Sequence, residues 1–237
     1  RNCGFAWEPG GFAVYICLAI FINLFFLKSD KGSSKRFWVL LITLLTTQST
    51  TGFVIFLIIG LFYYLNENLK KILLVLPIIV VGIVLILSLP FMTEKIISLA
   101  QDVNDVDAIV ASGYGRETSV TPQRFASFLI AFKDFYLNPI LGTGGYKGES
   151  WTAKIGVNIS TISGLGNLLS YFGLVGFLFF AIVSYKISIL YSIHYGYNGK
   201  VLFFLIVLSI SISYGILFMP LIMCFWIYSL FETGDLK

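Results

Sequence analysis

The distribution of apolar residues constrains this chain most. Five apolar runs are long enough to cross a lipid bilayer or half of one, and they cover 11–27, 37–65, 72–92, 165–185 and 201–231. Of the 237 residues, 57% are hydrophobic and 12% are charged, which is far from the composition of a soluble domain. We therefore expect an all-α fold, a polytopic bundle of membrane helices.

The beginning of the chain indicates a fragment. Arg1 stands where Met would start a protein, and no signal-peptide pattern precedes the first apolar run. We expect residues 1–237 to form a single membrane domain, the C-terminal part of a longer protein. The three cysteines, Cys3, Cys17 and Cys224, suggest neither a disulfide framework nor a metal site.

The run 37–65 is too long for one span. A single helix there would measure about 44 Å, against roughly 30 Å of hydrocarbon. Its centre is polar, with Thr46-Thr47-Gln48-Ser49-Thr50-Thr51-Gly52, and basic residues flank both of its ends. Because basic residues favour the cytoplasmic side, this pattern predicts a hairpin with a polar tip.

The same rule orients the other segments. Most basic residues of the short connections lie in segments 28–36, 66–71 and 186–200 and in the C-terminal tail, so we place these inside and the N-terminus outside. The mostly polar segment 93–161 then becomes one large outer loop. In the run 201–231, Tyr214-Gly215 and Pro220 suggest a break and a second hairpin, although a kinked helix would give the same pattern.

Two candidate sites lie before and within the predicted hairpin. Glu8 and Pro9 precede the first apolar run, where Pro fits the first helical turn and an anion is favoured by the helix dipole. A role in helix capping explains Glu8 equally well. The tip residues Gln48, Ser49 and Thr50 should lie below the outer surface, where polar groups need protein or water around them; helix packing through small hydroxyl residues is the alternative.

The outer loop holds the third candidate. From Thr121-Pro122 onward, apolar residues recur at three- and four-residue spacing, which predicts an amphipathic helix along the membrane surface: Phe125, Phe128, Leu129, Phe132, Phe135 and Tyr136. Arg124 falls in its first turn, where a cation is unfavourable, so we interpret it as holding an anion. The glycines of 138–146 permit close backbone approach to a ligand, although a plain connector is the more ordinary interpretation.

Four passages resemble the superfamily of O-antigen polymerases and O-antigen ligases. They are Arg1 with Glu8-Pro9-Gly10, the tip Thr46–Gly52, Arg124 with Asn138-Pro139-Ile140-Leu141-Gly142-Thr143-Gly144, and Gly164-Leu165-Gly166-Asn167 running on to Gly176. The resemblance implies a membrane glycosyltransferase of the GT-C type in the bacterial inner membrane, all-helical, independent of metals and cofactors, with its site at the outer face. Its implied substrate is an oligosaccharide linked to polyprenyl (undecaprenyl) pyrophosphate.

The resemblance also suggests roles for individual residues. Arg124 and Arg1 would hold the donor pyrophosphate, because arginine binds phosphate through two donors at once. Glu8 would act as the base or orient the acceptor hydroxyl. Arg116 and Lys147 would be further phosphate contacts, although a solvated surface charge is the alternative for both. The residues that would bind sugar are Gln48, Ser49, Thr50, Asn167, Tyr146 and Trp151.

The position of histidine favours one branch of this superfamily. Its ligases use a histidine in the large outer loop, whereas the single histidine here, His194, lies on the predicted cytoplasmic side. We therefore expect a polymerase of O-antigen, capsule or exopolysaccharide repeat units, with a ligase or a flippase of the lipid-linked sugar as alternatives. The expected partners are the bilayer and a chain-length regulator, with no nucleic acid.

Overall fold

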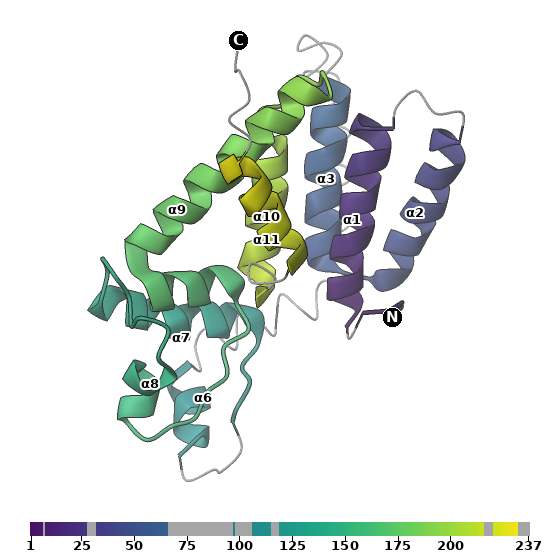
Figure 1. The fold of residues 1–237 in the computed structure, drawn as a ribbon. Helices are drawn as coiled ribbons and strands as arrows, with labels where there is room; N and C mark the ends of the chain where they lie inside the picture. The colour runs from purple at the N-terminus through teal and green to yellow at the C-terminus, as the bar shows by residue number, and fades with distance from the viewer. Residues whose placement is uncertain are drawn as a thin grey trace. The chain divides into compact units, whose positions relative to one another are not determined.

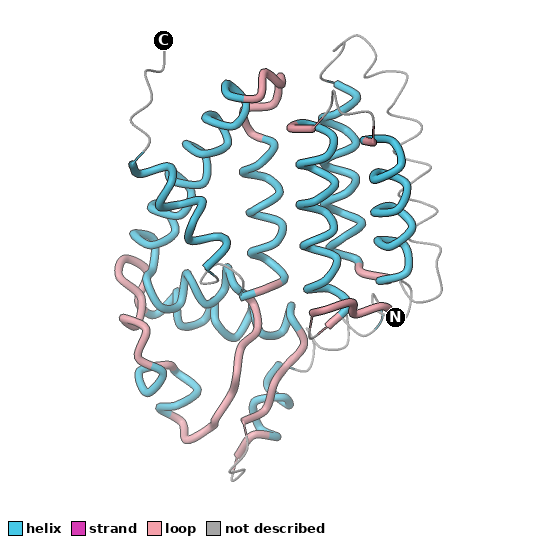
Figure 2. Tube along the Cα trace, turned by 45° about the vertical axis from the view of Figure 1, so that its right-hand side comes forward, coloured by secondary structure: helices cyan, strands magenta, loops and turns pink. Residues whose placement is uncertain are grey.

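The computed structural model describes residues 1–6, 8–27, 32–65, 97, 106–114, 119–215 and 220–231. Within these ranges the chain is mostly helical and forms no strand beyond an isolated bridge between Val120 and Ile159, as the helices and loops of Figure 2 show. The all-α expectation is therefore confirmed for the described residues. The apolar run 72–92 lies outside them. The chain divides into two compact units, Arg1–Thr93 with Tyr185–Ile210, and Glu94–Ser184 with Ser211–Lys237.

The first unit is built around α1, which spans Pro9–Phe25 and begins with the proline predicted for its first turn. Helices α2 (Ser33–Thr47) and α3 (Thr50–Leu65) both pack against α1, which lies between them (Figure 1). Phe21 of α1 is buried and its ring meets that of Phe203 at a centroid distance of 5.6 Å. Apolar contact between helices is thus what holds this unit together.

The break between α2 and α3 confirms the predicted hairpin tip. Gln48 adopts the left-handed conformation at φ 51°, which ends α2. Ser49 then caps α3, because its Oγ accepts a hydrogen bond of 3.2 Å from the Gly52 amide. A side chain at Gly52 would meet the Ala13 Cβ at 2.8 Å, so this glycine lets the tip pack closely against α1.

The second unit contains the helices of the predicted outer loop. These are α6 (Val106–Ser112), α7 (Arg124–Leu137), the 3-10 turn η2 (Lys147–Glu149) and α8 (Trp151–Lys154), followed later in the chain by α11 (Pro220–Phe231). Val110, Ile130 and Val157 form a small core beneath them. Two backbone hydrogen bonds join Val120 to the segment after α8. The Val120 amide donates to the Asn158 carbonyl at 3.0 Å, and the Ser160 amide donates to the Val120 carbonyl at 2.9 Å.

Helix α7 is the amphipathic helix that the sequence predicts. Its inner face is made of smaller side chains, buried in the unit: Ala126, Ser127, Ile130, Ala131 and Asp134. The aromatic residues Phe125, Phe128, Phe132 and Phe135 form a ladder of ring contacts on another face, where Phe125 and Phe132 are exposed. An exposed aromatic stripe is what a helix lying on a bilayer would present.

Helices α9 (Gly164–His194) and α10 (Leu202–Ser213) contribute residues to both units. Of the described helices, α9 alone has the length and apolarity to cross a membrane, while α1, α3 and α10 are apolar but shorter. The backbone of α9 is broken at Gly173, where φ is 60° and ψ is −154°. The run 201–231 is divided into α10 and α11, which confirms the break expected between Tyr214 and Pro220.

Candidate functional site

Arg124 is the first residue of α7, and the structure supplies the partner that the sequence leaves open. Its Nη2 donates a hydrogen bond of 2.5 Å to the Tyr214 hydroxyl, and its Cζ lies 4.1 Å from the centroid of the Tyr214 ring. Tyr214 is 4% exposed, whereas Arg124 is half-buried. A buried aromatic ring therefore holds a permanent cation at the beginning of a helix, where the dipole alone would disfavour it.

The position of Tyr214 depends on the beginning of α9. A Cβ on Gly164 would lie 2.0 Å from the Tyr214 carbonyl oxygen and 2.9 Å from that of Ser211, so only glycine fits there. The Ser163 hydroxyl donates a hydrogen bond of 3.2 Å to the Ile212 carbonyl. The end of α10 is therefore fixed against the start of α9, and the guanidinium of Arg124 is oriented through this contact.

The glycine-rich passage 138–145 lies against other backbone of the protein. It lies in the break of α9: the amides of Thr143 and Gly144 donate to the carbonyls of Ser170 and Tyr171 at 2.8 and 2.9 Å. In the other direction, the Leu174 amide donates to the Pro139 carbonyl at 2.8 Å. The passage thus satisfies carbonyls that end one half of α9 and an amide that begins the other half. The passage is therefore more than a plain connector, and the approach of its glycines to a ligand stays a prediction.

Two glycines make this backbone contact sterically possible. A Cβ on Gly142 would lie 2.5 Å from the Ser170 carbonyl oxygen, and a Cβ on Gly173 would lie 2.4 Å from that of Ile140. Both glycines also have positive φ angles, 66° and 60°. We refer to this arrangement of 138–145 against 170–175 as the glycine lock.

Asp134 is a buried carboxylate on the inner face of α7, and it is 5% exposed. Its Oδ1 accepts a hydrogen bond of 2.7 Å from the Trp151 amide, and its Oδ2 accepts one of 3.2 Å from the Ser170 hydroxyl. Burial raises the pKa of the Asp134 carboxyl above its ordinary 3.8, while both hydrogen bonds and the charge of Lys154 offset part of that rise. The carboxylate joins α7, α8 and α9.

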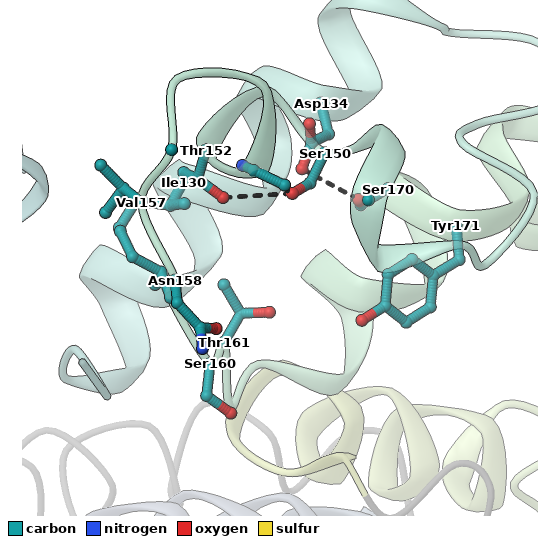
Figure 3. A pocket seen from close by; sticks show the side chains of 14 residues that line it. Ile130, Asp134, Ser150, Thr152, Val157, Asn158, Ser160, Thr161, Ser170 and Tyr171 are labelled. Carbon is teal, nitrogen blue, oxygen red and sulfur yellow. Dashed lines mark hydrogen bonds between the residues drawn. The ribbon is translucent and has the colours of Figure 1, made fainter. Parts of the chain in front are cut away.

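A cavity of about 340 Å³ lies beside Asp134, within the same unit. Figure 3 shows its walls: Asp134, Ser170 and Tyr171 come from α7 and α9, and Asn158, Ser160 and Thr161 come from the segment after α8. Two of its hydroxyls, those of Ser150 and Thr152, are hydrogen-bonded to each other at 3.2 Å. Of the fourteen described lining residues, eight have polar side chains, two are glycines and four are apolar.

Asn167 and Tyr146 lie beside this cavity rather than in its lining. The Asn167 amide donates to the Thr161 carbonyl at 3.1 Å and accepts from the Thr161 hydroxyl at 2.5 Å, which fixes Thr161 in the cavity wall. The Tyr146 side chain is 70% exposed and its ring covers Gly148, which lines the cavity. Arg116 lies outside the described residues, and for Lys147 only the backbone, in η2, is described.

Trp151 connects α8 to α7 and to the small core of this unit. Its indole Nε1 donates a hydrogen bond of 3.0 Å to the Ile130 carbonyl. The Lys133 ammonium lies 3.8 Å from the ring centroid, and the ring packs against the core of Val110, Ile130 and Val157. The lysine and the core packing cover part of the Trp151 ring, and stacking of this ring on a sugar stays a prediction.

The remaining candidates lie in the first unit, where the N-terminal segment meets the hairpin tip. The Asn2 amide donates to the Thr46 carbonyl at 3.1 Å, and its side chain donates to the Thr46 hydroxyl at 3.1 Å. This contact brings the segment of exposed Arg1 to the tip. Glu8 is the N-cap residue of α1 without a side-chain capping bond, Gln48 is exposed, and Thr50 begins α3.

Tyr214, Asp134 and Tyr171 are the residues that sequence reasoning missed. The sequence indicates Tyr214 only as the position of a helix break, and Asp134 resembles one more surface charge on an amphipathic helix. One signal was available for Asp134, because it falls on the helical face opposite the aromatic stripe and shares it with Ile130 and Ala131. In the described part of the chain, no cluster of histidine, cysteine or acidic residues is arranged to hold a metal ion.

Comparison with known proteins gives one match. The family model described as O-antigen ligase matches residues 36–181, which is more than half of the chain and includes Arg124, the glycine lock and Asn167. Neither the curated proteins nor the solved structures yield a match to this chain.

Proposed function

Because this chain belongs to the O-antigen ligase family, we propose that it is an inner-membrane glycosyltransferase that polymerises the lipid-linked repeat units of a bacterial surface polysaccharide. In this reaction an acceptor sugar hydroxyl attacks the anomeric carbon of the donor glycan. The bond from that carbon to the pyrophosphate oxygen breaks, polyprenyl pyrophosphate leaves, and the hydroxyl proton passes to a base. Glu8 is the proposed base, and the reaction requires neither a metal nor a cofactor.

The observation that carries this proposal is the half-buried Arg124 held against Tyr214. The leaving pyrophosphate gains negative charge as its bond breaks, and a preorganised guanidinium stabilises such charge without further rearrangement. Arginine suits phosphate because its planar donors bind two oxygens at once. Arg1 is proposed as the second cation, with Arg116 and Lys147 as peripheral contacts to the donor.

The proposed membrane arrangement follows from the apolar helices. We propose that α9 spans the bilayer, that α1, α3 and α10 form further membrane helices of a polytopic bundle, and that residues 93–161 lie outside the membrane. The exposed aromatic stripe of α7 would then rest at the outer surface, with Arg124 at its beginning. Such a position suits a substrate whose lipid stays in the bilayer while its sugars lie in water.

A ligase is the second candidate, because the family model bears that description. The position of the single histidine is our reason for proposing the polymerase first. His194 is the last residue of α9, where its ring contacts Tyr195, and it lies outside the segment 93–161. The sugar-binding roles proposed for Gln48, Ser49, Thr50, Asn167 and Tyr146 apply to either reaction.

The test is an elongation assay with the full-length protein and a labelled polyprenyl-pyrophosphate repeat unit, with products separated by size. We expect a ladder of longer lipid-linked chains, which Arg124→Ala reduces by roughly 100- to 1,000-fold, as for loss of one preorganised charge-stabilising donor. Lys154→Ala is the matched control, because it removes an exposed cation of the same unit that pairs with Glu149 at 3.0 Å. If the correctly inserted wild-type protein produces no ladder, the polymerase proposal is wrong. Transfer of glycan to lipid A core would then support the ligase.

A further inference from the structure

The described lining of the cavity beside Asp134 is unfavourable for a pyrophosphate. Of the described residues that line it, Asp134 alone carries a charge. A carboxylate repels phosphate, and Arg124 with its partner Tyr214 is not part of the lining. The cavity is therefore suited to a ligand without negative charge.

The lining favours a ligand rich in hydroxyl groups. Its hydroxyl side chains and one side-chain amide can both donate and accept hydrogen bonds. The hydroxyls belong to Ser150, Thr152, Ser160, Thr161, Ser170 and Tyr171, and the amide to Asn158. A carboxylate adds strong acceptors, and hydrogen bonds to a charged group are worth more than those between neutral groups. At about 340 Å³ the cavity lies near the lower end of the roughly 300 to 1,000 Å³ typical of small-molecule sites, which suits a short stretch of sugar.

The polar groups of this cavity are held in place before any ligand arrives. Asp134 is fixed by the Trp151 amide and the Ser170 hydroxyl, and Thr161 is fixed by the Asn167 side chain. Tyr171 belongs to the glycine lock, since its carbonyl accepts from the Gly144 amide at 2.9 Å. Its ring extends toward the cavity in Figure 3, facing the wall that carries Asn158 and Thr161. Fixed polar groups bind a ligand with a smaller entropic cost.

We propose that this cavity binds an uncharged sugar ring of the polysaccharide, with the Asp134 carboxylate accepting hydrogen bonds from its hydroxyls and Tyr171 lining the opposite side. The inference rests on the proposed function for the identity of the glycan. The second unit would then hold a sugar subsite with an acidic and hydroxyl lining, whereas the site of Arg124 is cationic. The acceptor chain and the sugar part of the donor are two sources of such a ring.

The experiment measures binding and kinetics separately in the full-length protein. The binding probe is a pool of lipid-free oligosaccharides of one to three repeat units, released by partial acid hydrolysis from the polysaccharide of the producing bacterium and observed by saturation-transfer difference NMR. We expect Asp134→Asn to weaken binding by about 10- to 100-fold, and Tyr171→Phe by about 2- to 10-fold, from the usual worth of charged and neutral hydrogen bonds. Asp107→Asn, an exposed carboxylate in α6, is the matched control and should bind like wild type.

Kinetics assign the source of the sugar ring. A rise in the KM for acceptor chains at unchanged donor KM places an acceptor sugar in the cavity, whereas a rise in donor KM alone places a donor sugar there. Unchanged binding and unchanged KM values in both variants, with the fold confirmed by an unaltered melting temperature of Tyr171→Phe, overturn the proposal. Failure of the proposed function is a separate result, because it appears as absent elongation by wild type while oligosaccharide binding is still measurable.

Discussion

Replacing Gly173 by alanine tests whether the glycine lock holds the break in α9. The φ of 60° and ψ of −154° at Gly173 lie in a backbone region that only glycine adopts readily, so alanine there costs about 1–3 kcal/mol from conformation alone. The new Cβ would also lie 2.4 Å from the Ile140 carbonyl oxygen and 2.7 Å from the Gly142 nitrogen. These contacts are with backbone atoms, so no flexible side chain can move aside.

Relief of the overlap requires the two backbone segments to separate. Separation weakens the hydrogen bonds that join them, which include those from Leu174 to Pro139 and from Thr143 to Ser170, both 2.8 Å. Each such bond contributes about 0.5–1.5 kcal/mol net, so loss of these two with the conformational strain costs roughly 2–6 kcal/mol in total. Gly144→Ala is the matched control: its φ of 70° is similar, but its Cβ would meet nothing within 4 Å, so only about 1–2 kcal/mol is expected.

Thermal unfolding in detergent, followed by tryptophan fluorescence and circular dichroism, measures this difference. The difference of about 1–4 kcal/mol corresponds to Gly173→Ala melting roughly 2–16 °C below Gly144→Ala, at about 2–4 °C per kcal/mol for a chain of this size. Gly142→Ala should resemble Gly173→Ala, because its Cβ meets backbone at 2.5 Å. Equal melting temperatures for Gly173→Ala and Gly144→Ala would refute the lock.

Three further predictions concern other contacts. Because burial raises the pKa of Asp134 above 3.8 in the folded protein, the contribution of Asp134 to stability is complete below pH 3.8 and declines as the pH rises through the folded pKa. Melting temperatures measured over this pH range should therefore fall for wild type relative to Asp134→Asn as the pH rises. Parallel curves for the two proteins would contradict the burial effect. Ser49→Ala should lower the free energy of unfolding by about 0.5–2 kcal/mol through loss of the α3 cap, whereas Thr50→Ala, which leaves that cap intact, should have a smaller effect in the same denaturation assay. Gly164→Ala should reduce elongation, because its Cβ would displace Tyr214, the partner of Arg124. The double variant Gly164→Ala with Arg124→Ala should lose less activity than the sum of the two single losses, and additive losses would show that the two positions act independently.

Local patterns were sufficient to predict several elements of the fold. The polar string 46–52 inside an apolar run identified the break between α2 and α3, because hydroxyl and amide side chains compete with helical hydrogen bonding. The apolar spacing after Pro122 identified α7, and Pro9 identified the start of α1. In each case the signal lies within a few residues of the element that it determines.

Pattern did not show which face of α7 contacts the protein. The aromatic residues dominate its apolar spacing, yet its buried face is made of small side chains and Asp134. A periodic stripe shows that a helix has two faces, but a membrane-surface helix can direct the more apolar face away from its own protein. The burial of Asp134, and with it the cavity, therefore appeared only in the structure.

The sequence by itself determined the class of the chain, the positions of its main helices and breaks, and the family resemblance, because apolar content, periodicity and motif order are properties of neighbouring residues. The tertiary structure decided which residues work together. Arg124 meets Tyr214 across 90 positions, and Gly142 meets Gly173 across 31. Such pairs depend on how whole helices pack, and the packing energy is shared among many side chains rather than marked at the two that touch.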